Sequence, residues 1–312
     1  MFATILGGLP RPSQPRDVPL DDIVEAAIRV QETNGLEPLT DGRLRWRSLD
    51  DPFVTKASRP LDAWRLAATM TTRPVKQALP GPYSLARRLE PDPGARAGLA
   101  LRLADEIRAE ILALADAGCP LVEIEESDAS AIGSDPVERT RFRDVHHRLT
   151  DGVSGTHLSL AIVGPSADAA GIETILAAPY ASLAVDLIAG PDNWRLVSTT
   201  PGERGIVAGA MSAEEAGDEG PELILYATRY AASTSGRGLH RVGVAIAPGL
   251  AALPWSSAVR KIERLGAAAR VAAMKPGPEL VDALDPRATD IRSAALGRHV
   301  ANPRPRSRRR IS

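Results

Sequence analysis

The sequence predicts a (β/α)8 barrel. Eight short runs rich in Val, Ile and Leu carry few charges, as expected for parallel strands covered on both faces. Longer amphipathic runs alternate with them, which is typical of βαβ units. A chain of 312 residues is long enough to build such a barrel around a large core. A doubly wound open sheet is the alternative, because it produces the same alternation.

The expected strands are short and mostly uncharged. They cover residues 3–8, 37–41, 75–79, 121–125, 156–162, 182–188, 205–209 and 241–247. The expected helices have apolar residues at helical spacing. They cover residues 20–33, 83–89, 96–117, 137–149, 167–177, 222–232 and 256–273. The clearest is 96–117, where Leu103, Ile107 and Ile111 share a face and Gly118 offers a C-terminal stop.

Composition sets the domain boundary and limits the partners. We expect a barrel over residues 1–275 and an extension over 276–312, with a basic and disordered end at 298–312. A nucleic-acid-binding arm is the alternative for this end. The net charge of −1 leaves the rest of the chain acidic, and aromatic residues make up only 4%. We therefore expect no nucleic-acid partner.

Other protein classes are excluded by simpler features. Cys119 is the single cysteine, which rules out a disulfide framework and a Cys-rich zinc module. The longest uncharged run, 242–259, contains Pro248 and Pro254, so we expect no membrane helix. With no targeting segment in sight, a cytoplasmic location is the default expectation.

Two carboxylates on the fourth expected strand are the first candidate site residues. Alternation along a strand points Glu123 and Glu125 toward the barrel axis, while Val122 and Ile124 face the helices. Inward carboxylates are costly unless they are paired or used. They could perform acid/base chemistry or bind an ammonium group; the alternative is a polar mouth satisfied by arginines.

Neighbouring strands add further polar groups. His157 and Ser159 point inward by the same parity, and the sixth strand offers Asp186. We expect Glu125, His157 and Asp186 to meet at one mouth, where they could hold a metal ion or a polar substrate. The alternative for His157 is a hydrogen-bonded core residue. His146 and His147 lie on an expected outer helix and should face solvent.

The order of these landmarks resembles the C-terminal catalytic domain of cobalamin-independent methionine synthase over nearly the whole chain. Residues 6–11, Leu-Gly-Gly-Leu-Pro-Arg, are similar to the family's Ile-Gly-Ser-Phe-Pro opening. Residues 40–43 resemble its "DGE" turn, 75–84 its "VK…LTGPxT" segment, and 118–126 its "aGxxxIQIDEP" segment. Residues 157–159 stand at its His-x-Cys, and 249–250 resemble its final "CGL" segment.

The resemblance implies a methyl transfer chemistry. That family folds as a (β/α)8 barrel and moves a methyl group from 5-methyltetrahydrofolate to homocysteine. Its zinc ion, held by His, Cys, Glu and Cys, activates the acceptor thiolate. Here His157 matches, Ser159 stands in place of the first cysteine, Asp186 stands near the glutamate, and Pro248 replaces the last cysteine. Because His157 and Asp186 alone make a weak site, we expect poor zinc affinity.

The acceptor positions differ as well. Gly8 replaces the motif serine, Arg43 the glutamate of "DGE", and Glu125 the aspartate. The reversed charge at Arg43 argues for an anionic ligand instead of the homocysteine ammonium. Lys76 would bind an anionic group too, and Gly7 would allow close backbone approach.

The resemblance therefore predicts a divergent methyltransferase acting on a small acceptor, with a folate or corrinoid donor and, in the second case, a corrinoid protein as partner. Glu123 and Glu125 would position or deprotonate the acceptor, and His157 would act as acid/base. The substrate-binding residues would be Gly7, Gly8, Arg43, Lys76 and Ser159. Two alternatives stay open: a non-catalytic ligand-binding barrel, or a metal-free enzyme resembling uroporphyrinogen decarboxylase.

Overall fold

A computed structural model describes residues 1–11, 18–56, 58–215 and 220–284. The chain divides into two compact units, Met1–Ala272 and Ala273–Ser312. The described strands and helices α1 to α10 all belong to the first unit, and helix α11 (Pro278–Leu284) belongs to the second. The expected basic end at 298–312 lies outside the described residues.

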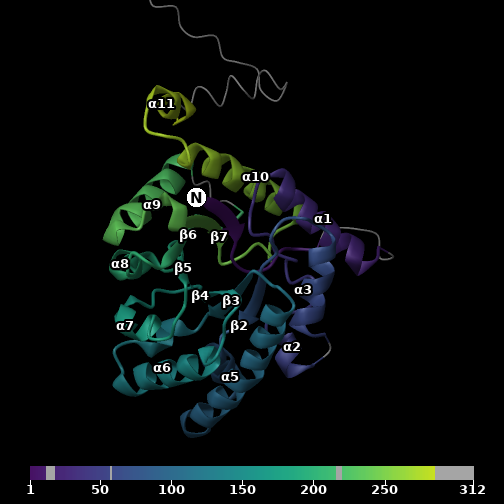
Figure 1. Ribbon diagram of the computed structural model, residues 1–312, viewed down its shortest axis with the longest axis vertical. Coiled ribbons are helices and arrows are strands. Elements are labelled where there is room, and N and C mark those ends of the chain that lie inside the picture. The colour runs from purple at the N-terminus through teal and green to yellow at the C-terminus, as the bar shows by residue number, and fades with distance from the viewer. Residues whose placement is uncertain (12–17, 57, 216–219, 285–312) are drawn as a thin grey trace, which may run out of the picture. The chain divides into compact units, whose positions relative to one another are not determined.

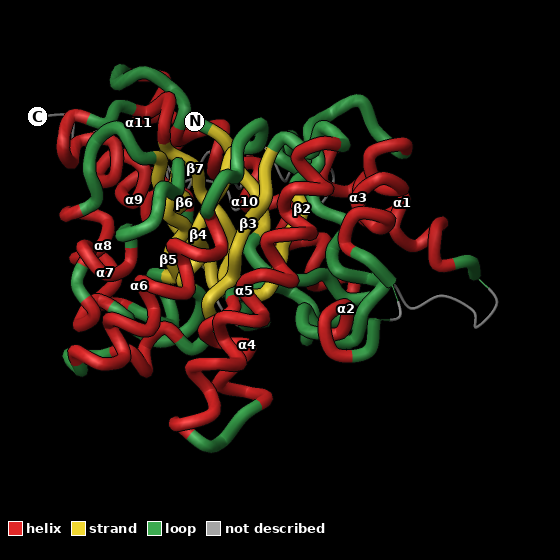
Figure 2. The backbone as a smooth tube through the Cα atoms, turned by 60° about the horizontal axis from the view of Figure 1, so that its bottom comes forward, coloured by secondary structure: helices red, strands yellow, loops and turns green. Residues whose placement is uncertain are grey.

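Seven parallel strands form the curved wall of an α/β barrel, in the order β1-β7-β6-β5-β4-β3-β2. Figure 1 shows these strands in the middle of the first unit with helices around them, and Figure 2 shows the same sheet from another side. The strands are β1 (Phe2–Ile5), β2 (Gln77–Pro80), β3 (Leu121–Glu126), β4 (His157–Ile162), β5 (Ser182–Asp186), β6 (Gly205–Ser212) and β7 (Val242–Ala247).

Helices cover the outer face of this sheet. They are α1 (Leu20–Thr33), α2 (Asp51–Val54), α3 (Pro60–Thr69), α4 (Pro82–Leu89), α5 (Pro93–Asp116), α6 (Pro136–Thr150), α7 (Ile172–Ile175), α8 (Trp194–Thr199), α9 (Pro221–Ser233) and α10 (Trp255–Ala272). The long helix α5 begins where the Asp92 side chain accepts the Ala95 amide and ends before Gly118, whose φ is +88°. Within the described ranges, no helix combines the length and apolarity that crossing a bilayer requires.

The expected strand at 37–41 is wrong as a strand. The segment forms one isolated parallel bridge, between Leu39 and Val75. It also contacts the opposite edge, because the Glu37 amide donates to the Ala3 carbonyl (2.8 Å) and the Thr4 hydroxyl donates to Pro38 (2.8 Å). Pro38 has no amide hydrogen to extend either ladder, which is the physical reason that pairing stops here.

Two helical expectations need correction. Residues 167–177 do not form one helix: a short turn at 168–170 and α7 are separated by Gly171, whose φ of +80° cannot belong to a helix. Helices α2, α3, α8 and α11 are not among the expected ones, although Pro60 in the first turn of α3 is a typical helix start. The other expected strands and helices are present within a few residues.

Two hydrophobic clusters lie on opposite faces of the sheet. The larger cluster packs the outward strand residues, such as Val122 and Ile124, against the helices. The smaller one fills the inside of the barrel with mostly small side chains: Leu6, Ala161, Val163, Ala184, Val207, Ala245 and Ala247. The alternation predicted for β3 is confirmed, since Val122 and Ile124 face the helices.

The carboxyl end of β3 is anchored by the buried carboxylate of Glu126. It accepts the backbone amides of Tyr83 (3.1 Å) and Ser84 (2.7 Å), and also the Ser84 hydroxyl. These amides belong to the first turn of α4, whose N-cap residue Gly81 supplies no side chain. Glu126 therefore caps α4 from outside the helix and ties it to the end of β3.

His146 completes this network and corrects the expectation that it faces solvent. The ring is buried, with Nε2 at 3.0 Å from Glu126 and Nδ1 at 2.6 Å from the Tyr180 hydroxyl. Burial, together with the charge of Glu126, raises the pKa of Tyr180, so the hydroxyl keeps its proton and donates to His146. His147, the next residue, is exposed as expected.

The contact between Gly81 and Glu126 leads to a first prediction. A β-carbon at Gly81 would collide with the Glu126 carboxyl group. We expect Gly81→Ala to lower the free energy of unfolding by about 3 kcal/mol, because the clash displaces a buried carboxylate from the amides it caps. Urea unfolding followed by circular dichroism measures this change.

Gly98→Ala is the matched control. Gly98 lies on the exposed face of α5, where an added β-carbon meets only the end of the Arg102 side chain at 3.6 Å. Because alanine favours a helix more than glycine does, this variant should gain up to about 1 kcal/mol. Equal stability of the Gly81→Ala variant and the wild type would contradict the capping role of Glu126.

Candidate functional site

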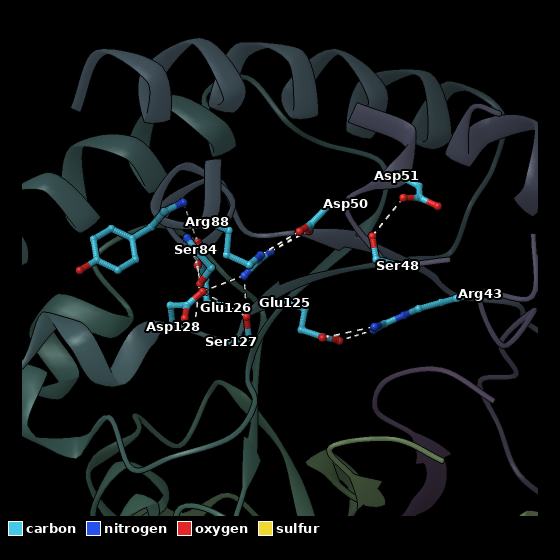
Figure 3. Close-up of polar contacts among 11 residues, drawn as sticks. Arg43, Ser48, Asp50, Asp51, Ser84, Arg88, Glu125, Glu126, Ser127 and Asp128 are labelled. Carbon is cyan, nitrogen blue, oxygen red and sulfur yellow. Dashed lines mark hydrogen bonds and ion pairs between the residues drawn. The ribbon is translucent and has the colours of Figure 1, made fainter. Parts of the chain in front are cut away.

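An ion pair between Arg43 and Glu125 dominates the carboxyl end of the barrel. Glu125 is the next-to-last residue of β3, and Arg43 follows the 37–41 segment. Arg43 Nη1 donates to Glu125 Oε1 at 3.3 Å, and Nη2 donates to Oε2. Figure 3 shows the guanidinium end pointing straight at the carboxylate. Both side chains are mostly buried, with 13% and 11% of their surface exposed, so solvent screens the pair only weakly.

The local sequence Asp-Gly-Arg sets the direction of Arg43. Gly42 and Arg43 both have positive φ values, +70° and +59°. The Arg43 amide donates to Asp41 Oδ1 (2.9 Å), so the aspartate side chain stabilises this left-handed turn. A non-glycine residue in this conformation is uncommon and is held here by the surrounding contacts.

Three buried polar atoms of this turn have no protein partner in the described part of the chain. They are Arg43 Nε, Asp41 Oδ2 and Trp46 Nε1. Each such atom costs roughly 1–3 kcal/mol unless a ligand or an ordered water satisfies it. Burial also raises the pKa of Asp41, against the opposing effects of the Arg43 amide and charge. Unpartnered donors and a perturbed carboxyl together mark this turn as a candidate binding site.

A cleft of about 400 Å³ lies beside the turn. Arg11, Arg43 and Arg47 line it, and none of the other described lining residues is acidic. Its apolar wall includes Leu9 and Trp46. The volume suits a small molecule, and the charge of the wall favours an anionic one.

Gly7 and Gly8 lie in the loop after β1, which borders this cleft. Gly7 has a φ of +86°, and a β-carbon there would collide with the Pro248 carbonyl. Gly8 lines the cleft, and its carbonyl accepts the Leu250 amide at 2.8 Å. The two glycines thus let the loops after β1 and β7 approach closely. Gly7 itself does not border the cleft.

Arg88 lies on the side of Glu125 opposite to Arg43 and connects several segments there (Figure 3). Its guanidinium binds Asp50 through two hydrogen bonds (2.7 and 2.8 Å), and it also donates to Ser127 (2.7 Å) and Asp128 (2.8 Å). Figure 3 shows how these contacts join α4, the loop after β3 and the segment before α2. The sequence contains 38 basic residues, and no local pattern singled out Arg88, Arg11 or Arg47.

Glu123 and Lys76 form a second ion pair deeper inside the barrel. Lys76 Nζ donates to Glu123 Oε2 at 2.8 Å, and the two side chains are only 2% and 3% exposed. Glu123 lies two residues before Glu125, about 7 Å nearer the amino end of β3. The structure thus places Lys76 against a carboxylate and not in the arginine-lined cleft.

His157 and Ser159 lie toward the amino end of the barrel, away from Glu125. His157 is the first residue of β4 and pairs in register with Leu121, the first residue of β3. Its Nε2 is 2.8 Å from the Ser182 hydroxyl, which donates to Ser159 at 2.9 Å. Partial burial lowers the pKa of His157, so the ring is neutral at neutral pH.

The expectation that Glu125, His157 and Asp186 share one mouth is therefore wrong. Asp186 ends β5, and the pairing of Ile162 with Val185 puts it level with Val163. His157 lies six residues before Val163, so at 3.3 Å per residue it is about 20 Å from the level of Asp186 along the strand. Asp186 instead accepts the amides of Ile188 and Ala189 (both 2.9 Å) and orders the loop after β5.

The residues present do not fit the zinc site that the resemblance implies. His157 and Asp186 lie at opposite strand ends, Pro248 has no ligand atom, and the Ser159 hydroxyl bonds to Ser182. Across the described ranges, no three His, Cys, Asp or Glu side chains are grouped closely enough to hold a metal ion.

The fold has clear counterparts among solved structures. A B12-independent methionine synthase from a Shewanella species superimposes with a TM-score of 0.73 over 86% of this chain and 96% of that one, at 15% identity. An L-ribulose 3-epimerase matches with a TM-score of 0.51 over 97% of this chain and 99% of the other, at 11% identity. No family model matches the sequence, and the comparison with curated proteins found no match. At these identities the likeness shows an α/β barrel fold.

The raised pKa of Asp41 leads to a prediction about pH. Between its ordinary pKa and the raised value, the folded state holds a proton that the unfolded state has lost. The free energy of unfolding therefore falls as pH rises through that interval. Asp41→Asn keeps an acceptor for the Arg43 amide and removes this dependence. We expect the stability of the variant relative to wild type to increase with pH, as measured by urea unfolding at several pH values.

Glu222→Gln on α9 is the control for general charge effects, because Glu222 lies on the surface in the first turn of a helix. The free energy of unfolding of Asp41→Asn, taken relative to wild type, could instead stay constant or fall as pH rises. Either result would contradict a buried Asp41 whose pKa is raised.

Proposed function

We propose that this protein is a methyltransferase-like barrel that binds a small anionic acceptor at the carboxyl end of the strands. The proposal rests on the cleft beside Arg43, since barrel enzymes place their chemistry at this end. The fold of the B12-independent methionine synthase supports methyl transfer as the class of reaction.

The unused edge of the Arg43 guanidinium is the observation that carries the proposal. Glu125 occupies the end of the guanidinium through Nη1 and Nη2. The side edge, which carries Nε, has no partner among the described residues. Guanidinium groups bind carboxylates and phosphates through either edge. Arg43 can therefore hold a substrate anion while Glu125 keeps the group in place.

Glu125 would also take the acceptor's proton. Glu125 keeps its contacts with Arg43 and lies beside the anion that Arg43 holds, so its carboxylate would be the base at the mouth. The acceptor atom then gives its proton to Glu125 and forms a bond to the methyl carbon. The bond between the donor and that carbon breaks, and the donor keeps the electron pair. A folate donor also takes up a proton at its nitrogen, which Glu125 would return to it. Folate and corrinoid compounds, the latter carried by a corrinoid protein, are the proposed donors.

A non-catalytic ligand-binding barrel is the second candidate. It is favoured by the complete pairing of Glu125, because both carboxylate oxygens are engaged by Arg43. Under this alternative the cleft binds the same anions, but no proton leaves the ligand. Binding and methyl transfer must therefore be measured separately.

Replacement of Arg43 tests the binding step. We expect succinate or inorganic phosphate to raise the melting temperature of the wild type more than homocysteine does. Arg43→Gln should weaken anion binding by about 30-fold, because one charge-assisted contact is lost. Isothermal titration calorimetry measures this change independently of any loss of stability.

Arg148→Gln is the matched control. Arg148 forms an exposed ion pair with Asp105 and does not line the cleft. This variant should bind anions like the wild type. An Arg43→Gln variant that binds anions equally well would overturn the proposed site.

Glu125→Gln separates catalysis from binding. The variant retains an oxygen acceptor for Arg43 but cannot take a proton at neutral pH. We expect anion affinity to stay equal or rise, because less charge competes for Arg43, whereas methyl transfer should fall by about 100-fold. Transfer of a labelled methyl group from 5-methyltetrahydrofolate or methylcobalamin measures the rate. Anion binding without transfer in the wild type would leave the binding barrel as the function.

A further inference from the structure

A second cavity, of about 580 Å³, lies at the amino end of the barrel, opposite the proposed catalytic mouth. Its inner wall includes the buried residues Glu123, Ser159 and Ser182, and the exposed His157 lies at the entrance. Its rim contains exposed residues such as Glu203, which leaves the entrance open to solvent.

Small inward-facing side chains create this space. Ser159 and Ser182 are paired in register, and Ser182 is paired with Gly205 on the next strand. Barrel interiors are usually filled at such positions by layers of Val, Ile and Leu. Phe2 fills only one part of the interior, where Gly243 leaves room for its ring. The sequence therefore leaves this end hollow.

The wall of the cavity contains Glu123, whose buried carboxylate has one oxygen with no partner among the described residues. Glu123 Oε2 accepts from Lys76, but Oε1 has no hydrogen-bond partner within the described ranges, and only 3% of the side chain is exposed. A carboxylate oxygen left this way loses its hydration without compensation. A bound molecule that donates a hydrogen bond would remove this penalty.

His157 supplies a second acceptor on the same wall. The Ser182 hydroxyl donates to Ser159, and the His157 tautomer that matches this direction donates from Nε2 to Ser182. The neutral ring then leaves Nδ1 with a free lone pair. Both unused groups on the wall accept hydrogen bonds.

The remaining lining sets the rest of the ligand's chemistry. Phe2, Pro38, Pro120, Leu121, Ile206 and Val207 provide apolar surface. The ion pair of Lys76 and Glu123 is neutral overall, and the other charged lining residues, Glu37, Glu203 and Arg241, are exposed at the rim, where solvent screens them. The inner wall therefore attracts neither a cation nor an anion strongly. An apolar body with one or two donor groups matches this wall.

We propose that this cavity is a binding site for a small neutral molecule with an apolar body and an O–H or N–H donor directed at Glu123 Oε1. The site is separate from the arginine-lined cleft, and its occupant is not the anionic acceptor.

Phenol and toluene provide a matched pair of probes, because they have nearly the same shape and only phenol donates a hydrogen bond. We expect phenol to bind the full-length protein at least about tenfold more tightly than toluene. Titrations followed by NMR measure both affinities, and a crystal soaked with phenol should show the ring between Glu123 and His157. Equal affinities, or a cavity that holds only water, would overturn the proposal.

A double variant tests the role of the Glu123 carboxylate. Lys76→Met with Glu123→Leu replaces the buried ion pair by apolar groups of similar size, a change that folded proteins tolerate. We expect phenol and toluene to bind this variant equally well. A persistent preference for phenol would show that Glu123 is not the acceptor.

Arg43→Gln separates the two sites. This variant should retain the wild-type affinity for phenol even where it loses anion binding, because Arg43 does not line the amino-end cavity. Loss of phenol binding in Arg43→Gln would mean that phenol occupies the arginine-lined cleft. This result would overturn the proposed site in the amino-end cavity, and the proposed anion site would be unaffected by it.

Discussion

A charged side chain buried inside a β-barrel needs an ion-pair or hydrogen-bond partner. The structure depends on how the carboxylates of strand β3 satisfy this constraint. Three carboxylates lie within four residues, and each has a different solution. Glu123 pairs with Lys76, Glu125 pairs with Arg43, and Glu126 turns outward to backbone amides and His146. Without these partners, desolvation would cost more than the strand could recover. The same pairings decide which carboxylate is available for chemistry.

The two inner pairs differ because arginine and lysine differ. Lys76 presents a compact charge in a nearly closed environment, and Glu123 receives it on one oxygen only. Arg43 presents a planar group with two edges, so it can serve Glu125 and still face a ligand. The carboxyl end is therefore suited to anions, while the amino end offers an acceptor in an apolar cavity. The alanine-rich cluster, which includes Ala161 and Ala184, fills the interior at the level of Glu125.

The likeness to a methionine synthase extends through the fold but not through its metal chemistry. The register of β4 and β5 carries His157 and Asp186 to opposite ends, and each already has a structural partner. Serine and proline at the other positions offer no thiolate. A barrel of this shape can retain substrate binding at the strand ends while its means of activating the acceptor changes, because the loops and the wall vary independently.

Features that depend on local geometry could be predicted from the residues alone. Period-two alternation placed Val122 and Ile124 outward and Glu123 and Glu125 inward, and helical spacing with Gly118 as a stop defined α5. Only the tertiary structure decided where each residue lies along the barrel axis. Alternation along a strand such as β4 indicates which face a residue lies on but not which neighbour it meets along the barrel axis, so the expectation put His157 at the wrong end. The pair of Arg43 and Glu125, 82 residues apart, likewise exists only because parallel strands bring their carboxyl ends together.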